Sequence, residues 1–123
     1  MPFSILVVDD DDTNLTLLAK ILELEGYQVT KAHNARDAIQ SAVQKKPDLA
    51  LLDVMMPDMD GFELCRRMRQ PPFSLEIPIV MLTAMNSDGE QAQALKAGAN
   101  EIWSKPFDME TFRQRIRNLV KKE

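Results

Sequence analysis

Near the middle of the chain, Leu49-Ala50-Leu51-Leu52-Asp53 forms a continuous apolar run that ends in an acid. Two other stretches have the same form, since the apolar residues 5–8 lead into Asp9 and the apolar residues 79–82 lead into Thr83. Continuous apolar runs of this length are typical of strands buried on both faces, as in a parallel sheet covered by helices. The three stretches therefore predict interior strands of such a sheet.

Helical patterns alternate with these strands. Apolar residues recur at the spacings of a helix face over residues 15–22, 35–43 and 112–120, and shorter helices are expected at residues 61–69 and 88–97. Asn34 and Asp108 stand where helix N-caps are expected, as does one of Asp11 and Asp12. Less hydrophobic strand candidates at residues 28–32 and 102–104 complete five strand–helix pairs.

The order of elements sets the fold class. Strands that alternate with helices predict βαβ units with right-handed crossovers, which build a parallel sheet with helices on both faces. The most loop-like segment, residues 70–74, is too short to separate two domains. We expect one α/β domain over residues 1–123.

Length and composition exclude several classes of protein. The chain has 123 residues, of which 45% are hydrophobic, enough for one sizeable core. Its 15 basic and 19 acidic side chains give a net charge of −4, which disfavours nucleic acid as a partner because phosphate backbones demand clustered basic residues. No apolar stretch reaches the ~20 residues of a membrane span, and no signal peptide is expected. The single cysteine, Cys65, fits a reducing compartment, so we expect a cytoplasmic domain.

Chemically active side chains follow four of the expected strands. Asp9 and Asp10 follow the first strand, Asp53 the third, Thr83 the fourth and Lys105 the fifth. Ligands of an open parallel sheet bind at the carboxyl ends of its strands, where these side chains converge. The sequence therefore places three acids, a hydroxyl and an ammonium group in one site.

The composition of this site points to a metal ion. Three adjacent carboxylates repel one another, so at least one stays protonated unless a cation joins them. Oxygen ligands without a nearby His or Cys favour a hard ion such as Mg²⁺ over zinc. A dication and Lys105 together balance the charge of the three acids. Such a site suits phosphoryl transfer, in which a carboxylate can itself accept the phosphoryl group.

Four motifs stand at these strand ends in a characteristic order. They read Ile5-Leu6-Val7-Val8-Asp9-Asp10, Asp53-Val54-Met55-Met56-Pro57-Asp58-Met59-Asp60-Gly61-Phe62-Glu63, Leu82-Thr83-Ala84 and Lys105-Pro106-Phe107. Together, and over nearly the whole chain, they resemble the receiver domain of two-component response regulators. The resemblance implies a three-layer, flavodoxin-like, doubly wound parallel sheet with the strand order 2-1-3-4-5.

The resemblance also implies roles for the acidic residues. Asp53 would accept a phosphoryl group from a phosphohistidine on a sensor histidine kinase or a phosphotransfer protein. Asp10 and Asp53 would bind Mg²⁺ together with the backbone carbonyl of Met55. Asp9 would act through water or orient the site. The domain would be a phosphorylation-controlled switch in a phosphorelay, not an enzyme that turns over an external substrate.

The remaining motif residues would respond to the phosphoryl group. Lys105 would pair first with the acids and then with the phosphoryl oxygens. Thr83 would turn its hydroxyl onto the phosphoryl group, and the Ala84 N–H would be a second donor. Pro106 would follow a cis peptide bond. Activation would then be a shift of population toward the conformer in which Thr83 faces the site.

The chain departs from the family pattern at two places. Ile102 stands where many receivers have an aromatic residue that moves with the hydroxyl residue. Trp103 cannot replace that residue because adjacent strand residues point to opposite faces. Met55 and Met85, at positions that modulate phosphoryl lifetime in the family, offer no polar side chain to an attacking water, so we expect no fast self-dephosphorylation.

Two other function classes stay open. The departure at Ile102 is compatible with an interaction module that has kept the fold and lost phosphorylation. A small metal-dependent phosphatase with an aspartyl nucleophile is disfavoured, because such enzymes place a second acid where this chain has Met55.

The resemblance also bears on partners and on the extent of the protein. It offers the fourth helix, fifth strand and fifth helix as a candidate homodimer surface, to which Glu101, Arg113 and Arg117 could contribute ion pairs. Exposed charges at such spacings are usually solvated. The chain could be a complete single-domain regulator or the N-terminal part of a longer one.

Overall fold

The computed structural model describes residues 3–84, 87–105 and 108–121, and strands and helices alternate through this part of the chain. The strands are β1 (Ser4–Val8), β2 (Gln28–Ala32), β3 (Leu49–Asp53), β4 (Ile79–Thr83) and β5 (Glu101–Ser104). The helices are α1 (Asp12–Leu24), α2 (Ala35–Gln44), α3 (Gly61–Arg69), α4 (Asp88–Ala97) and α5 (Met109–Lys121). Every predicted strand and helix is therefore present, with boundaries that differ by a few residues.

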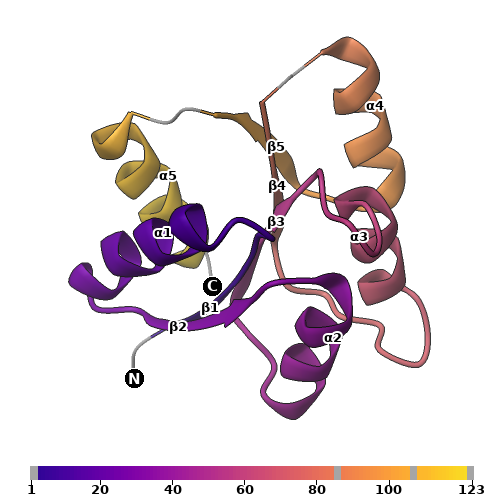
Figure 1. Cartoon of the computed structure of the whole chain (residues 1–123), viewed down its shortest axis with the longest axis horizontal. Helices are drawn as coiled ribbons and strands as arrows, with labels where there is room; N and C mark the ends of the chain where they lie inside the picture. The colour runs from indigo at the N-terminus through magenta and orange to yellow at the C-terminus, as the bar shows by residue number, and fades with distance from the viewer. Residues whose placement is uncertain (1–2, 85–86, 106–107, 122–123) are drawn as a thin grey trace.

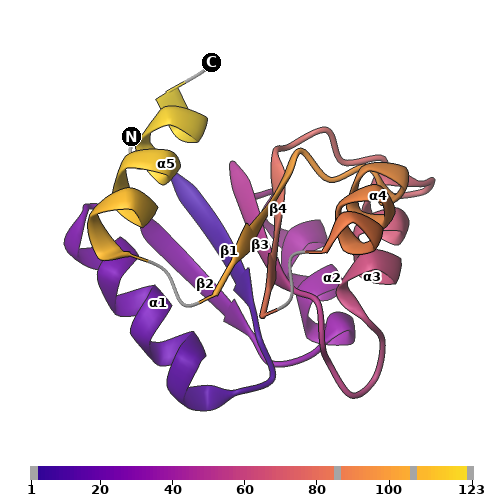
Figure 2. The same ribbon diagram turned by 90° about the horizontal axis from the view of Figure 1, so that it is seen from above.

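All five strands lie parallel in one sheet with the order β2-β1-β3-β4-β5. Helices α1 and α5 cover one face of the sheet, and α2, α3 and α4 cover the other (Figure 1). The view from above shows the same two helical layers on either side of the strands (Figure 2). This architecture confirms the predicted flavodoxin-like α/β fold.

The core is divided between the two faces of the sheet. Because successive residues of a strand point to opposite faces, Ile5 and Val7 pack beneath α1 and α5, whereas Leu6 and Val8 pack on the side of α2, α3 and α4. Strands β3 and β4 alternate in the same way and are buried along their whole length. The continuous apolar runs in the sequence thus follow from burial on both faces.

Side chains cap the helices as the sequence predicted. The Asp11 carboxylate accepts hydrogen bonds from backbone N–H groups in the first turn of α1, and Asn34 does the same for α2. Asp108 accepts the Thr111 N–H at 3.0 Å at the start of α5. Gly98 ends α4 with φ = 99°, a left-handed conformation that favours glycine. These caps fix where each helix begins or ends relative to the sheet.

Across residues 3–84, 87–105 and 108–121, none of the helices combines the length and the apolar character that crossing a membrane requires.

The expectations for Met85 and for a cis peptide before Pro106 fall on residues 85–86 and 106–107, which lie outside the described residues.

Candidate functional site

Strand ends bring the predicted acids together. Asp9 and Asp10 directly follow β1, and Asp53 is the last residue of β3, the neighbouring strand in the sheet. One carboxylate oxygen from each of the three residues lies within 4.8 Å of the others. We call these three residues the acidic cluster. The convergence expected from strand topology is therefore present in the structure.

Lys105 points into the acidic cluster. Its Nζ donates a 2.7 Å hydrogen bond to Asp53 Oδ1 and lies 3.8 Å from Asp9 Oδ2. The lysine reaches this position because β5 pairs with β4 and β4 pairs with β3, so the residue after β5 stands near the end of β3. Lys105 is therefore oriented so that its charge, together with that of a dication, could balance the three acids.

Burial sets the electrostatics of the cluster. Asp9 and Asp53 are only 2% and 6% exposed, whereas Asp10 is exposed to solvent. Desolvation raises the pKa of both buried carboxyls, and repulsion from the neighbouring acids raises it further. The Lys105 ammonium works in the opposite direction on both pKa values without cancelling the rise. The cluster therefore holds excess negative charge that a further cation would relieve.

The donor atoms of the cluster fit a hard divalent cation. Among the described residues, the buried Asp9 Oδ2 accepts no hydrogen bond, although its partner oxygen Oδ1 accepts the Asp11 N–H at 2.9 Å. The three donors are carboxylate oxygens, which suit Mg²⁺ better than a softer metal. Exposed Asp10 leaves one side of the cluster open to water, which Mg²⁺ usually keeps in its coordination shell.

Thr83 lies at the end of β4 with its side chain buried. Its hydroxyl donates a 2.7 Å hydrogen bond to Glu90 Oε1, in the first turn of α4. Sequence reasoning did not assign a role to Glu90. The spacing of Ser87 and Glu90 is that of a capping box, which suggests a role within α4 and gives no hint of the contact to Thr83.

The loop between β3 and α3, residues 54–60, closes tightly beside Asp53. At its base the Gly61 N–H donates to Val54 O at 2.8 Å. A Cβ atom at Gly61 would lie 2.3 Å from the backbone oxygen of Asp53, so only glycine fits there. The Met55 side chain is 75% exposed. A thioether is a poor ligand for a hard ion, so any contribution of Met55 to a magnesium site would come from its backbone carbonyl.

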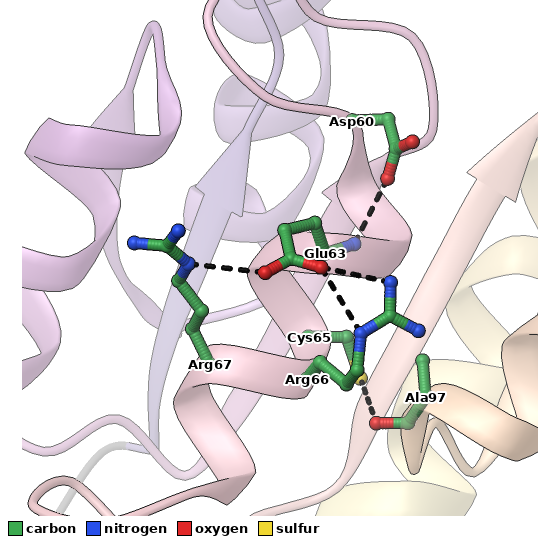
Figure 3. A network of polar contacts seen from close by, with 6 residues as sticks. All are labelled: Asp60, Glu63, Cys65, Arg66, Arg67 and Ala97. Atoms are coloured by element: carbon green, nitrogen blue, oxygen red, sulfur yellow. Dashed lines mark hydrogen bonds and ion pairs between the residues drawn. The ribbon is translucent and has the colours of Figure 1, made fainter.

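The start of α3 fixes the C-terminal end of this loop. Asp60 accepts the Glu63 N–H at 2.9 Å and so caps the helix (Figure 3). The Glu63 carboxylate is in turn paired with Arg66 at 2.8 Å and with Arg67 at 3.2 Å. The acid in the first turn and the bases in later turns suit the helix dipole. The loop is therefore attached to a well-capped helix.

A cavity of about 520 Å³ opens beside the acidic cluster, between α1 and α5. Its polar lining residues are Asp9, Asn14 and Lys105, and the exposed residue Ala84 also lines it. Most of its remaining wall is apolar and comes from the two helices, with exposed Leu17 and Met109 at its surface. Asp9 and Lys105 therefore border an apolar cavity, in addition to the side of the cluster that Asp10 leaves open to water.

Residues of β5 take opposite faces of the sheet, as predicted. Ile102 packs against the core on the side of α2, α3 and α4, whereas Trp103 is buried on the side of α1 and α5. Trp103 makes an edge-to-face contact with Phe112, with ring centroids 6.0 Å apart, and its Nε1 donates to Glu101 at 2.7 Å. Trp103 is therefore a packing residue and does not occupy the position of the missing aromatic.

Charged residues expected on a dimer surface make contacts within the chain. Arg113 and Arg117 of α5 each lie 3.8 Å from the carboxylate of Glu25, which follows α1. Glu101 accepts the hydrogen bond from Trp103. These side chains have partners without a second copy of the chain.

Comparisons with known proteins agree with this geometry. Residues 5–117 match the family described as the response regulator receiver domain. The chain is 40% identical over 121 residues to the response regulator PleD of Caulobacter vibrioides, covering 98% of this chain and 27% of PleD. It is 39% identical to the alkaline phosphatase synthesis transcriptional regulatory protein PhoP of Bacillus subtilis, covering 96% of this chain and 48% of PhoP. The chain thus spans about half or less of the length of these relatives.

Solved structures show the same arrangement. The chemotaxis protein CheY4 of Vibrio cholerae superimposes with a TM-score of 0.91 at 29% sequence identity. The match covers 97% of this chain and 99% of CheY4.

Proposed function

This chain belongs to the family of response regulator receiver domains, and we propose that it accepts a phosphoryl group on Asp53 and acts as a phosphorylation-controlled switch. The observation that carries the proposal is the setting of Asp53. It is a buried carboxylate that accepts a hydrogen bond from Lys105, and it lies beside two further acids. A carboxylate at a strand end can accept a phosphoryl group as an acyl phosphate when a positively charged group such as Lys105 lies close enough to stabilise the phosphoryl oxygens.

We further propose Mg²⁺ as the cofactor of this site. Asp10, Asp53 and the backbone carbonyl of Met55 would hold the ion, and Asp9 would contact it through water or orient the other ligands. When bound, the ion would neutralise the acids and the incoming phosphoryl oxygens. The excess negative charge of the acidic cluster and the unsatisfied Asp9 Oδ2 support this assignment.

In the transfer step, an Asp53 carboxylate oxygen would attack the phosphorus of a phosphohistidine on a sensor histidine kinase or phosphotransfer protein. A P–O bond forms as the P–N bond to the histidine breaks, roughly in line. Lys105 then moves its ammonium group from the Asp53 carboxylate to a phosphoryl oxygen. Its present 2.7 Å contact leaves only a short distance to travel.

The signal would pass through Thr83 and Ala84. The phosphoryl group offers the Thr83 hydroxyl a charged acceptor, which competes with Glu90, and the Ala84 N–H is a second donor. The new charge therefore favours a conformer in which the end of β4 has moved toward Asp53. This switch is proposed to operate in the cytoplasm. Homodimerisation through α4, β5 and α5 stays a prediction.

Intact-mass analysis after incubation with Mg²⁺ and acetyl phosphate tests the proposal. We expect one added phosphoryl group in the parent protein and none in Asp53→Asn or in parent protein treated with EDTA. Asp37→Asn, which removes an exposed acid on α2, is the matched control and should be phosphorylated normally. Folded protein that neither binds Mg²⁺ nor gains mass would instead support a phosphorylation-independent interaction module.

A further inference from the structure

Asp58 makes a contact that the proposed transfer step does not use. It lies in the β3–α3 loop, and its carboxylate contacts the first turn of α2. Both of its oxygens lie 3.2 Å from the Ala35 N–H, and Oδ2 also accepts the Arg36 N–H at 3.4 Å. Asn34, the N-cap of α2, accepts the Asp37 N–H at 2.8 Å. Asp58 and Asn34 together therefore satisfy the free N–H groups at the start of α2.

The strand that leads into α2 contacts the segment that carries Asp9. The Asp9 N–H donates to Ala32 O at 3.1 Å, which continues the β1–β2 pairing to the last residue of β2. Through Asp58, the start of α2 contacts the loop that follows Asp53. The end of β2 and the start of α2 therefore lie against both segments that supply acidic ligands.

Asp58 attaches the β3–α3 loop to α2. The two ends of the loop are joined by the hydrogen bond between Gly61 and Val54, and its C-terminal end is fixed by the Asp60 cap on α3. Between these ends, Met56 and Met59 pack against the core, whereas the exposed side chain of Met55 contributes little packing to hold its backbone in place. The carboxylate of Asp58 attaches this part of the loop to α2, where its charge is favourable at a helix N-terminus.

We propose that Asp58 is a positioning residue for the divalent cation of the acidic cluster. By fixing the loop to α2, it holds the backbone carbonyl of Met55 where that carbonyl and the carboxylates of Asp10 and Asp53 can bind one ion. This inference rests on the proposed function, since it requires Mg²⁺ at the cluster. Groups that hydrogen-bond directly to metal ligands commonly change metal affinity by ~10–100-fold. Because Asp58 is exposed and acts through the loop rather than on a ligand, we expect a smaller effect of about three- to tenfold.

Calorimetric titration of Mg²⁺ into three variants tests this proposal, at a temperature where circular dichroism shows each to be folded. Asp58→Ala should raise the Mg²⁺ Kd about three- to tenfold, and Asp58→Asn, which keeps an acceptor oxygen, should raise it less. Asp37→Ala is the matched control, because it removes an acid from the helix turn that Asp58 contacts and leaves the loop unchanged. Its Kd should equal that of the parent protein.

A second readout separates positioning from general damage to the fold. The rate of phosphorylation by acetyl phosphate should be reduced in Asp58→Ala at low Mg²⁺ and should return to the parent rate at saturating Mg²⁺. An unchanged Kd in Asp58→Ala, or a rate that stays low at saturating Mg²⁺, would overturn the inference and leave the proposed function intact. A parent protein that binds no Mg²⁺ would overturn the metal site and this inference together.

Discussion

Thr83 and Glu90 are joined by a 2.7 Å hydrogen bond, in which the Thr83 hydroxyl donates to the Glu90 carboxylate. The bond connects the buried end of β4 to the first turn of α4. A threonine hydroxyl has one proton to donate, so it cannot donate to Glu90 and to a phosphoryl group on Asp53 at the same time. In the proposed switch, Glu90 would therefore favour the unphosphorylated arrangement.

Removal of the Glu90 acceptor should make activation easier. A hydrogen bond to a charged group contributes about 1.5–3 kcal/mol, and partial exposure of Glu90 reduces that contribution here. We expect Glu90→Ala to bind the phosphoryl mimic beryllofluoride roughly three- to tenfold more tightly in the presence of Mg²⁺. Titration followed by NMR measures the affinity.

Two comparisons make the Glu90 result specific. Glu90→Gln should fall between the parent protein and the alanine variant, and Gln93→Ala, at an exposed position of the same helix, should behave like the parent. Equal or weaker beryllofluoride binding by Glu90→Ala would show that the bond does not restrain the switch.

The acidic cluster should make stability depend on pH and on Mg²⁺. The pKa values of Asp9 and Asp53 are raised above their ordinary value of 3.8, so the folded state binds protons more tightly than the unfolded chain. The stability that these two carboxyls contribute is therefore fully present below pH 3.8, and it is lost as the pH rises through their raised pKa values in the folded state. At neutral pH, neutralising one acid with Asp53→Asn should stabilise the metal-free protein.

Mg²⁺ should stabilise the parent protein for the same reason. At a hundredfold excess over its Kd, a ligand of the folded state adds about 2.7 kcal/mol, which corresponds to a rise in Tm of roughly 10 °C for a domain of this size. Thermal denaturation at neutral pH with Mg²⁺ or EDTA measures the shift. A Tm that does not respond to Mg²⁺, or that responds equally in Asp53→Asn, would be inconsistent with binding at the cluster.

Gly61 should not tolerate a side chain. A Cβ atom there would lie 2.3 Å from Asp53 O and 2.7 Å from Met81 Cε, and the backbone atom cannot move without shifting the end of β3. We expect Gly61→Ala to lower the free energy of unfolding by about 3 kcal/mol or more, as measured by urea denaturation. Gly89→Ala in α4 is the control, because its nearest neighbour would be 3.8 Å away. Equal stabilities of the two variants would contradict the close approach seen at Gly61.

Most of the fold was predictable because its signals are local. The apolar runs of β1, β3 and β4 are read directly from the chain, and the caps at Asn34 and Asp108 stand three residues before the N–H groups that they accept. The strand order 2-1-3-4-5 came from the family resemblance, since periodicity does not say which strands pair. The meeting of the acidic cluster with Lys105 followed from the rule that parallel strands end at one edge.

The contacts of Glu90 and Asp58 could not be predicted in the same way. Both residues are acids near helix starts, where a local capping role explains them equally well. Glu90 instead reaches Thr83 in the preceding strand, and Asp58 reaches Ala35, 23 residues away along the chain. Such contacts depend on the relative placement of whole elements and on one side-chain rotamer, neither of which the sequence pattern encodes.

The Cys65 thiol should be unreactive in the native protein. Cys65 is buried in α3, where its Sγ donates to Ala97 O at 3.4 Å (Figure 3). Burial raises its pKa to about 11, so at pH 8 only roughly one thiol in a thousand is ionised. We expect native protein to react with DTNB at least about a hundredfold more slowly than protein unfolded in guanidinium. Similar rates in the two states would show that the thiol is accessible and ionised.

Locating the modified residue tests whether Asp53 carries the phosphoryl group. After phosphorylation with acetyl phosphate and Mg²⁺, sodium borohydride reduces an aspartyl phosphate to homoserine, and peptide mass spectrometry identifies the converted position. We expect homoserine at position 53 and at no other aspartate, including Asp9 and Asp10. Conversion at another acid, or a stable adduct on a hydroxyl residue with Asp53 unchanged, would contradict this expectation.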